Sequence, residues 1–454
     1  MQNRITMNSK SLQEKFPEVY REFFSKCPIV VSVPGCFFWS GEYSVLFGGL
    51  AIKQNIPIRV YVGLEPNRRD NFEMGESITF APSSSCFESW NRFTPDVKNK
   101  LVGFLNGEAR KLWPSTRTGF KINTLSEIPP GCGLSLEGGF PTALTAAIFL
   151  ASDLISPAVV NRWNQLPVYQ LSADKDFDRL LRAAWKVDFV FRSAFASGAP
   201  IFFPLAHSIY PIVYFIEAQT EAAVPNLSAI DHRKYLGFRV DELINLGKKD
   251  SIDLGALRTW PVDFGLIFAE DVRDEDSTIR SIKETGEYLS TFSSWWKNIL
   301  PKLGMPESKI LFAKIIRDSR AKVGGAYLDA LVTIGLETLY GLGRILSRGA
   351  SREAIRDFLR IVNCTHQLLA PLYAPSRVSD EIGFLVDRYV RDLGDDCGAG
   401  CRLVVEKKAD VLFVVNSHIL RDRISELITD LQNKTKRNVD YYLWWHWMPC
   451  IWSR

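Results

Sequence analysis

The stretch IPPGCGLSLEGG, residues 128–139, carries the strongest signal in this chain of 454 residues. It follows FKINTLSE (residues 120–127), which is expected to be a strand, and precedes FPTALTAAIFLASDLI (residues 140–155), whose Ala and Leu residues predict a buried helix. Gly131 and Gly133 let the backbone come close to a ligand, and the helix start offers N–H groups with a positive dipole end. The stretch therefore predicts a phosphate site. An ordinary strand-to-helix turn fits the same residues, and neither GxxxxGK[ST] nor GxGxxG occurs.

This stretch resembles the phosphate loop of the GHMP kinases (galactokinase, homoserine kinase, mevalonate kinase and phosphomevalonate kinase), which has the form P-P-x-x-G-L-x-S-S-A-A at the start of a helix. The match is close up to Leu134, and the chain then departs from the two serines and two alanines of the family. Glu137 stands at a serine position that assists magnesium in the family, and its carboxylate is a hard oxygen ligand suited to that ion. The resemblance implies a nucleotide site formed by Pro130, Gly131, Cys132, Gly133, Leu134, Ser135, Glu137, Gly138 and Gly139.

A second match lies in residues 33–51, VPGCFFWSGEYSVLFGGLA, which resemble the family's opening segment P-G-[KR]-x-x-L-x-G-E-[HY]-x-V-x-x-G-x-x-A. The GEYSVL part is nearest the mevalonate and phosphomevalonate branch. Because this segment lines the phosphoacceptor pocket in the family, the resemblance implies substrate contacts from Glu42, Tyr43 and Ser44. Cys36 stands where relatives carry Lys or Arg. A β-hairpin with a Gly-rich turn is the alternative interpretation of the segment.

In the family, a helix with an acidic metal ligand is followed by S-G-x-D, whose aspartate acts on the acceptor hydroxyl. AAWKVDFVFRSAFASGAP (residues 183–200) supplies Asp188 on a predicted helix and Ser197-Gly198 as further substrate contacts, but the aspartate position falls on Pro200. We expect Asp188 and Glu137 to hold magnesium. Lys186 and Asp188 are the expected catalytic residues, with Lys186 or Arg192 supplying positive charge.

A third, more divergent match is DLGDDCGAGC, residues 392–401, which resembles the family's C-terminal glycine motif and precedes a strand. The order and spacing of the three matches imply the family's two-domain α+β fold. An N-terminal α/β domain with a left-handed βαβ unit is expected over residues 1–235, and a ferredoxin-like domain over residues 236–454.

Further elements follow from the local patterns. Helices are expected near residues 177–190, 279–300, 326–346, 351–368 and 419–434. Strands are expected at PIFFPL (residues 200–205), IYPIVYFIE (209–217), VDFGLIFAEDV (262–272), CRLVVEKK (401–408) and ADVLFVVNS (409–417). The Trp-rich tail, residues 441–454, is expected to dock on the body of the protein or to contact a membrane surface or partner.

Composition limits the classes of partner and compartment. Lys and Arg number 55 against 51 Asp and Glu, a net charge of +4 that gives no field suited to nucleic acid. Residues 1–26 carry charges throughout and no apolar run reaches a membrane span, which predicts a cytoplasmic protein. The eight cysteines are expected to be free thiols, since Cys397 and Cys401 lack companion ligands for zinc.

Together these patterns predict a kinase that uses ATP and Mg²⁺ to phosphorylate a hydroxyl or phosphate of a small metabolite of the mevalonate or sugar type. Two alternatives stay open: a GHMP-fold protein that has lost catalysis and serves in binding or regulation, and an unrelated α/β enzyme. The expected partner is a small-molecule substrate, and a homodimer is left open.

Overall fold

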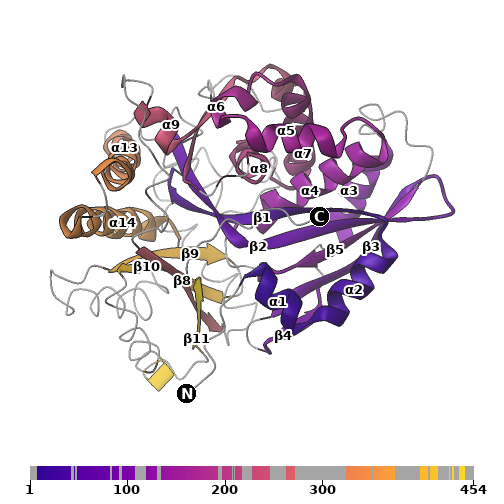
Figure 1. Cartoon of the computed structure of the whole chain (residues 1–454), viewed down its shortest axis with the longest axis horizontal. Coiled ribbons are helices and arrows are strands. Elements are labelled where there is room, and N and C mark those ends of the chain that lie inside the picture. The colour runs from indigo at the N-terminus through magenta and orange to yellow at the C-terminus, as the bar shows by residue number, and fades with distance from the viewer. Residues whose placement is uncertain are drawn as a thin grey trace, which may run out of the picture.

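The computed structural model describes residues 8–41, 45, 49–81, 84–90, 95–107, 119–129, 134–192, 197–206, 208, 210–216, 227–245, 262–270, 324–348, 351–373, 399–406, 409–417, 429, 432–433 and 439–444. These residues form two sheets with helices packed on them (Figure 1), so the expected α+β class is confirmed. The larger sheet holds the residues that precede the phosphate stretch. The smaller sheet lies in the second half of the chain.

The larger sheet is built around one long strand. Its strands are β1 (Ile29–Ser40), β2 (Leu50–Pro66), β3 (Phe72–Ala81), β4 (Cys86–Ser89), β5 (Phe120–Ser126), β6 (Ile212–Ile216) and β7 (Tyr235–Arg239). Their order is β4-β3-β5-β2-β6-β7, with β1 paired to β2. Strands β3 and β5 run parallel, and the other pairs are antiparallel. The sheet is therefore mixed, with β2 joining β1, β5 and β6.

Helices cover both faces of this sheet (Figure 1). One face carries α1 (Ser9–Lys15) and α2 (Pro17–Lys26). The other carries α3 (Pro95–Asn106), α4 (Leu136–Ala151), α5 (Pro157–Gln165), α6 (Val168–Leu171), α7 (Lys175–Arg192) and α8 (Ala199–Leu205). Helix α4 lies between β1, β2, α7 and α8, which explains why its sequence is apolar on nearly all sides. A short 3₁₀ turn, η4 (Leu227–His232), and α9 (Val240–Asn245) complete this half.

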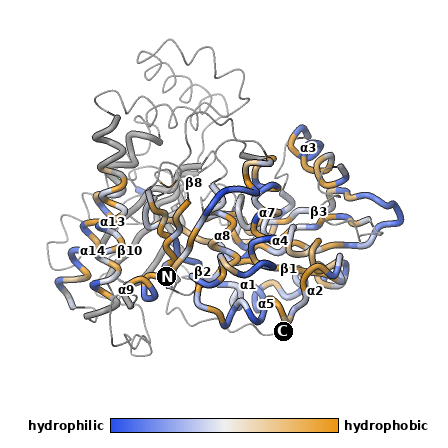
Figure 2. The backbone as a smooth tube through the Cα atoms, turned by 90° about the horizontal axis from the view of Figure 1, so that it is seen from above, coloured by the Kyte–Doolittle hydropathy of each residue, from blue (hydrophilic) through white to orange (hydrophobic). Residues whose placement is uncertain are grey.

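The smaller sheet consists of β8 (Val262–Glu270), β9 (Ala399–Glu406), β10 (Ala409–Ser417) and β11 (Val439–Trp444). Its order is β11-β8-β10-β9 and every pair is antiparallel, which is the arrangement of a ferredoxin-like sheet. Helices α13 (Gly324–Arg348) and α14 (Arg352–Tyr373) connect β8 to β9 and pack on each other. Both are striped with polar and apolar residues in Figure 2, as expected of helices with one buried side. No helix within the described residues is long and apolar enough to cross a membrane.

One predicted strand is a helix instead. PIFFPL was expected to be extended, but residues 199–205 form α8, which begins after Gly198 in a left-handed conformation and carries Pro200 in its first turn. Proline is well suited to the first turn because its fixed φ matches a helix and its missing N–H has no partner there anyway. Strand β3, whose residues are a mixture of polar and apolar ones, was not predicted. The other expected strands, and the helices near 177–190, 326–346 and 351–368, are present.

Several expectations lie outside the described residues. These include the helix at 279–300, most of the helix at 419–434 and the tail beyond Trp444. The proposed division of the chain at residue 235 stays a prediction. Strand β7, which ends at Arg239, belongs to the larger sheet, and β8, which begins at Val262, belongs to the smaller one.

Candidate functional site

Glu127, which follows β5 and precedes the phosphate stretch, is held in place by four hydrogen bonds. The Glu127 carboxylate is fully buried and accepts hydrogen bonds from Tyr20 Oη at 2.7 Å, Tyr61 Oη at 3.0 Å, the Arg59 backbone N–H at 2.7 Å and the Ser9 hydroxyl. Burial raises the pKa of this carboxyl, and these four hydrogen bonds oppose the rise. Glu127, the residue just before the phosphate stretch, thereby links α1, α2 and β2.

The stretch resumes at Leu134 and Ser135, where α4 begins. The carbonyl of Leu134 accepts a hydrogen bond from the backbone N–H of Cys36 at 3.0 Å, which joins the first and second sequence matches. Ser135 has φ 63° and ψ 27°, a left-handed conformation, and its carbonyl accepts the N–H of Gly139 at 2.8 Å. The chain thus turns sharply at Ser135 and enters a helix of 16 residues, which gives the start of α4 a positive dipole end.

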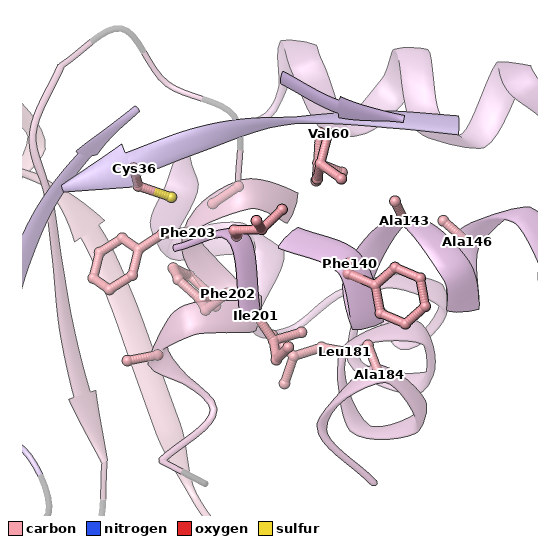
Figure 3. Packing of buried hydrophobic residues seen from close by; sticks show 14 of the residues in the cluster. Cys36, Val60, Phe140, Ala143, Ala146, Leu181, Ala184, Ile201, Phe202 and Phe203 are labelled. Atoms are coloured by element: carbon pink, nitrogen blue, oxygen red, sulfur yellow. The ribbon is translucent and has the colours of Figure 1, made fainter. Parts of the chain in front are cut away.

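Two glycines allow close packing at the first turn of α4. A Cβ atom on Gly138 would lie 2.3 Å from the carbonyl oxygen of Pro200 and 2.5 Å from its Cβ, and one on Gly139 would lie 2.8 Å from a methyl group of Val60. Figure 3 shows the neighbouring contacts, with Val60 of β2 above α4 and the apolar side chains of α8 beside it. Residue 200, which is the position of the aspartate in the S-G-x-D pattern named above, therefore lies directly against the first turn of the helix that follows the phosphate stretch.

The predicted site residues of the segment at 183–200 lie on two elements. Asp188 is fully buried on α7, and Ser197 and Gly198 are buried where α8 begins. Gly198 has φ +76°, and a Cβ atom there would lie 2.8 Å from the Trp185 ring, so only glycine fits this turn. Tyr214 of β6 donates a hydrogen bond to the Ser197 carbonyl at 3.1 Å. Packing of α4 on α7 and α8 brings these residues to the same side of the sheet as Ser135.

Two lysines, Lys186 and Lys53, have different surroundings. Lys186 is the expected catalytic lysine, and Lys53 was not predicted as a site residue. Lys186 binds the carboxylate of Asp231 on η4 at 2.7 Å, and it lies two residues from Asp188, on a different face of α7. Lys53 of β2, by contrast, is fully buried and donates a hydrogen bond to the Ser135 hydroxyl. In the sequence, Lys53 is marked by being the only charged residue in GGLAIKQNIPI, residues 48–58, most of which are apolar or glycine.

Other predicted site residues lie outside the described residues. These are Pro130, Gly131, Cys132, Gly133, Glu42, Tyr43 and Ser44, together with most of the match at 392–401. Their roles stay predictions. The neighbouring Gly41 is described, and its φ of +86°, with a Cβ that would lie 1.9 Å from the Leu50 carbonyl oxygen, explains why glycine precedes Glu42.

The donor chemistry is compatible with magnesium. Asp188 presents a buried carboxylate, and Glu137 lies in the first turn of α4, so both expected ligands belong to elements that pack on each other. Carboxylate oxygens are the protein groups that Mg²⁺ prefers, and the ion usually takes one or two of them with the phosphate oxygens of a nucleotide. No cluster of three or more metal-binding side chains occurs among the described residues.

Comparison with known proteins gives likenesses in structure. No protein-family model matches the chain, and no curated protein sequence matches it. Lactococcus lactis galactokinase in complex with galactose is similar over 96% of this chain and 97% of its own, with 13% identity and a TM-score of 0.49. L. major mevalonate kinase in complex with R-mevalonate is similar over 91% and 95%, with 11% identity and a TM-score of 0.48. Streptococcus pneumoniae phosphomevalonate kinase is similar over 91% and 99%, with 12% identity and a TM-score of 0.46. All three are kinases of the group that the sequence matches resemble, and likeness at this level carries no argument about the reaction of this chain.

Proposed function

We propose that this protein is an ATP-dependent small-molecule kinase that transfers the γ-phosphoryl group to a hydroxyl or phosphate of a small metabolite. The observation that carries the proposal is the junction at the start of α4. There Cys36 of the match at residues 33–51 bonds to Leu134 of the phosphate stretch, and Gly138 of that stretch contacts Pro200, which ends the segment of residues 183–200. Three segments far apart in the sequence therefore meet at one helix N-terminus, where phosphate is favoured.

In the proposed reaction the chain acts mainly by positioning. Phosphoryl transfer has a loose transition state, so most of the acceleration comes from alignment of the two substrates and from stabilisation of charge on the transferred group. The start of α4 would bind the nucleotide phosphates, and Asp188 with Glu137 would hold Mg²⁺, which neutralises phosphate charge when bound. Ser197, Gly198 and residues 42–44 would face the acceptor. An acceptor of the mevalonate or sugar type is supported by the sequence resemblance.

Acceptor-dependent release of ADP tests the proposal. The purified protein is supplied with ATP, Mg²⁺ and, in turn, mevalonate, phosphomevalonate, galactose and homoserine, and ADP is measured in a coupled assay. We expect one class of acceptor to raise ADP release well above the rate without acceptor. Asp188→Asn serves as the matched variant, because it keeps the size of the side chain while removing the carboxylate. Equal rates with and without every acceptor, in both proteins, would contradict a kinase of this type.

One observation favours a second candidate, a nucleotide-binding protein without kinase activity. Pro200 stands where related kinases carry an aspartate, and it is buried against Gly138, so no carboxylate reaches the acceptor from this position. This candidate predicts that ATP with Mg²⁺ binds in calorimetry while no acceptor stimulates ADP release. Absence of both binding and release would exclude the two candidates together.

A further inference from the structure

The chain leaves the larger sheet and enters the phosphate stretch through two residues, Glu127 and Ile128. The backbone N–H of Glu127 donates to the Arg59 carbonyl at 2.9 Å, which extends the contact of β5 with β2 one residue beyond Ser126. The N–H of Ile128 donates to the Ser126 hydroxyl at 3.2 Å, and its carbonyl accepts from that hydroxyl at 2.8 Å and from Thr79 Oγ1 at 3.3 Å. Both backbone groups of Ile128 are thus bound by side chains, which fixes the direction in which the chain leaves the sheet.

The two residues that follow Ile128 are both proline, at positions 129 and 130. A proline ring fixes φ at about −65° and restricts the residue before it to extended conformations. Few dihedrals can therefore change between Ile128 and the glycines of the stretch, so a shift at Glu127 is passed on to the residues after it. The Ile128 side chain is fully buried, and its terminal carbon lies 2.9 Å from the position of a Cβ atom on Gly35. A displacement of Ile128 would thus also reach the match at residues 33–51.

The Glu127 side chain is held from the face of the sheet that lies opposite α4 (Figure 1). Its carboxylate accepts hydrogen bonds from Ser9 of α1, Tyr20 of α2 and Tyr61 of β2. Helix α1 also contributes Gln13, whose amide donates to Tyr61 Oη at 3.1 Å. We call Ser9, Tyr20, Tyr61 and Glu127 the Glu127 cluster. It connects both N-terminal helices to the residue at which the phosphate stretch begins.

A fully buried carboxylate is not needed merely to attach two helices. Removal of a carboxylate from water costs free energy, and apolar side chains attach helices to sheets without that cost. The rings of Tyr20 and Phe87, with centroids 5.7 Å apart, already provide such packing between α2 and the sheet. Hydrogen bonds add direction, because each requires a set distance and angle. The Glu127 cluster therefore fixes the position of residue 127 more narrowly than apolar packing alone would.

We propose that Glu127 is a positioning residue for the phosphate stretch, and that α1 and α2 act through the Glu127 cluster to set the affinity for the nucleotide. The inference rests on the proposed function for what the stretch binds. Because the carboxylate is buried and faces α1 and α2, Glu127 acts through the backbone of Ile128 and not by contact with the substrates. Such coupling is reciprocal: a nucleotide that binds more tightly when the helices are attached must favour their attachment by the same factor.

Tyr20→Phe provides the first test, because it removes one hydrogen bond to Glu127 and keeps the ring. We expect its Kd for ATP with Mg²⁺, measured by calorimetry, to rise about 5- to 10-fold, the lower range of coupling between separate sites. Tyr235→Phe is the matched control, since Tyr235 of β7 donates an equivalent hydrogen bond to Asp178 of α7 at 2.9 Å. Its Kd should equal that of the wild type. An unchanged Kd in Tyr20→Phe, or an equal rise in both variants, would overturn the inference.

Amide hydrogen exchange in residues 9–26 tests the reciprocal effect, which a purely structural role would not produce. Saturating ATP with Mg²⁺ should slow exchange in α1 and α2 of the wild type about 5- to 10-fold. The slowing should be smaller in Glu127→Gln, whose amide cannot accept all four hydrogen bonds; Tyr61→Phe replaces this variant should it not fold. Helix α5, which has no residue in the Glu127 cluster, is the control. Equal slowing in α1, α2 and α5 would contradict the inference.

Failure of the inference can be separated from failure of the proposed function. An unchanged Kd for ATP in Tyr20→Phe, with acceptor-dependent ADP release retained, would refute the role of Glu127 and leave the kinase. Affinity for ATP that depends on Tyr20 and Glu127, without ADP release for any acceptor, would support the role and refute the kinase. A wild-type protein that binds no ATP would refute both.

Discussion

Single atoms decide the packing at the start of α4, as the contact between Gly138 and Pro200 illustrates. Replacement of Gly138 by alanine would place a Cβ atom 2.3 Å from the Pro200 carbonyl oxygen, and backbone cannot move aside easily. We expect Gly138→Ala to lower the free energy of unfolding by about 1–3 kcal/mol, despite the better helix propensity of alanine. Urea denaturation measures the change.

Gly103 offers a matched control on α3. A Cβ atom there has nothing within 4 Å, so Gly103→Ala should be neutral or raise the free energy of unfolding by up to about 1 kcal/mol. Equal stabilities of Gly138→Ala and Gly103→Ala would show that α4 and α8 are not in close contact. The comparison tests the position of residue 200 relative to the phosphate stretch.

The two lysines show what the sequence can and cannot reveal at the residue scale. Lys186 was predicted to supply positive charge because it lies shortly before the Ser197-Gly198 segment; its ammonium binds Asp231, and its catalytic role stays a prediction. Lys53 was missed because its burial depends on Phe203, which is 150 positions further along the chain and belongs to a segment expected to be a strand. The sequence pattern around Lys53 cannot predict a contact with a residue so far along the chain.

At the scale of elements, the helices α1 and α2 are attached to the larger sheet through Glu127. Glu127→Ala would leave the buried hydroxyls of Tyr20 and Tyr61 without their acceptor, so we expect a loss of about 3 kcal/mol in the free energy of unfolding. Faster proteolysis within residues 8–26 should accompany the loss. Glu14→Ala on α1 is the control, because Glu14 is exposed and pairs only with exposed Lys10; a change below about 0.5 kcal/mol is expected. Unchanged proteolysis in Glu127→Ala would contradict this attachment.

The same carboxyl predicts a dependence of stability on pH. Burial raises the pKa of Glu127 above its ordinary 4.5, so the folded state holds this proton more tightly than the unfolded state. The stabilisation from proton binding is fully present below pH 4.5 and is lost as the pH rises through the folded-state value. We expect the stability of the wild type relative to Glu127→Gln to fall as the pH rises from 4.5 upward. A stability difference that stays constant across this range, measured by urea denaturation, would mean that Glu127 does not titrate in it.

Helix α8 explains how a whole element was predicted wrongly. Its residues, APIFFPL, have the apolar and aromatic composition of a strand, and six of the seven are buried. The decisive signals were Gly198 in a left-handed conformation and Pro200 in the first turn, which start a helix. Helix α4 was predicted correctly because its 16 residues exceed the usual length of a buried strand.

At the scale of the whole molecule, α14 connects the second half of the chain to the larger sheet. Phe358 is fully buried, and its ring lies 5.0 Å from that of Trp39 at the end of β1. Phe358→Ala should cost about 3–5 kcal/mol and split the heat-unfolding transition in two, as seen by calorimetry. Tyr340→Ala, at an exposed site on α13, should leave a single transition within about 0.5 kcal/mol of the wild type. One unsplit transition for Phe358→Ala would show that this ring contact does not couple the halves.

The pairing of β2 also sets the order in which the chain can fold. Residues 50–53 of this strand pair with β6, with Leu50 opposite Phe215, whereas residues 60–66 pair with β5. Strand β1 pairs with β2 between residues 52 and 64. Contacts between residues so distant in sequence close large loops and are slow to form. During synthesis, the β2 edge from Leu50 to Lys53 therefore lacks the strand that covers it until Ile216 has left the ribosome, and the sheet is complete only after Arg239 follows.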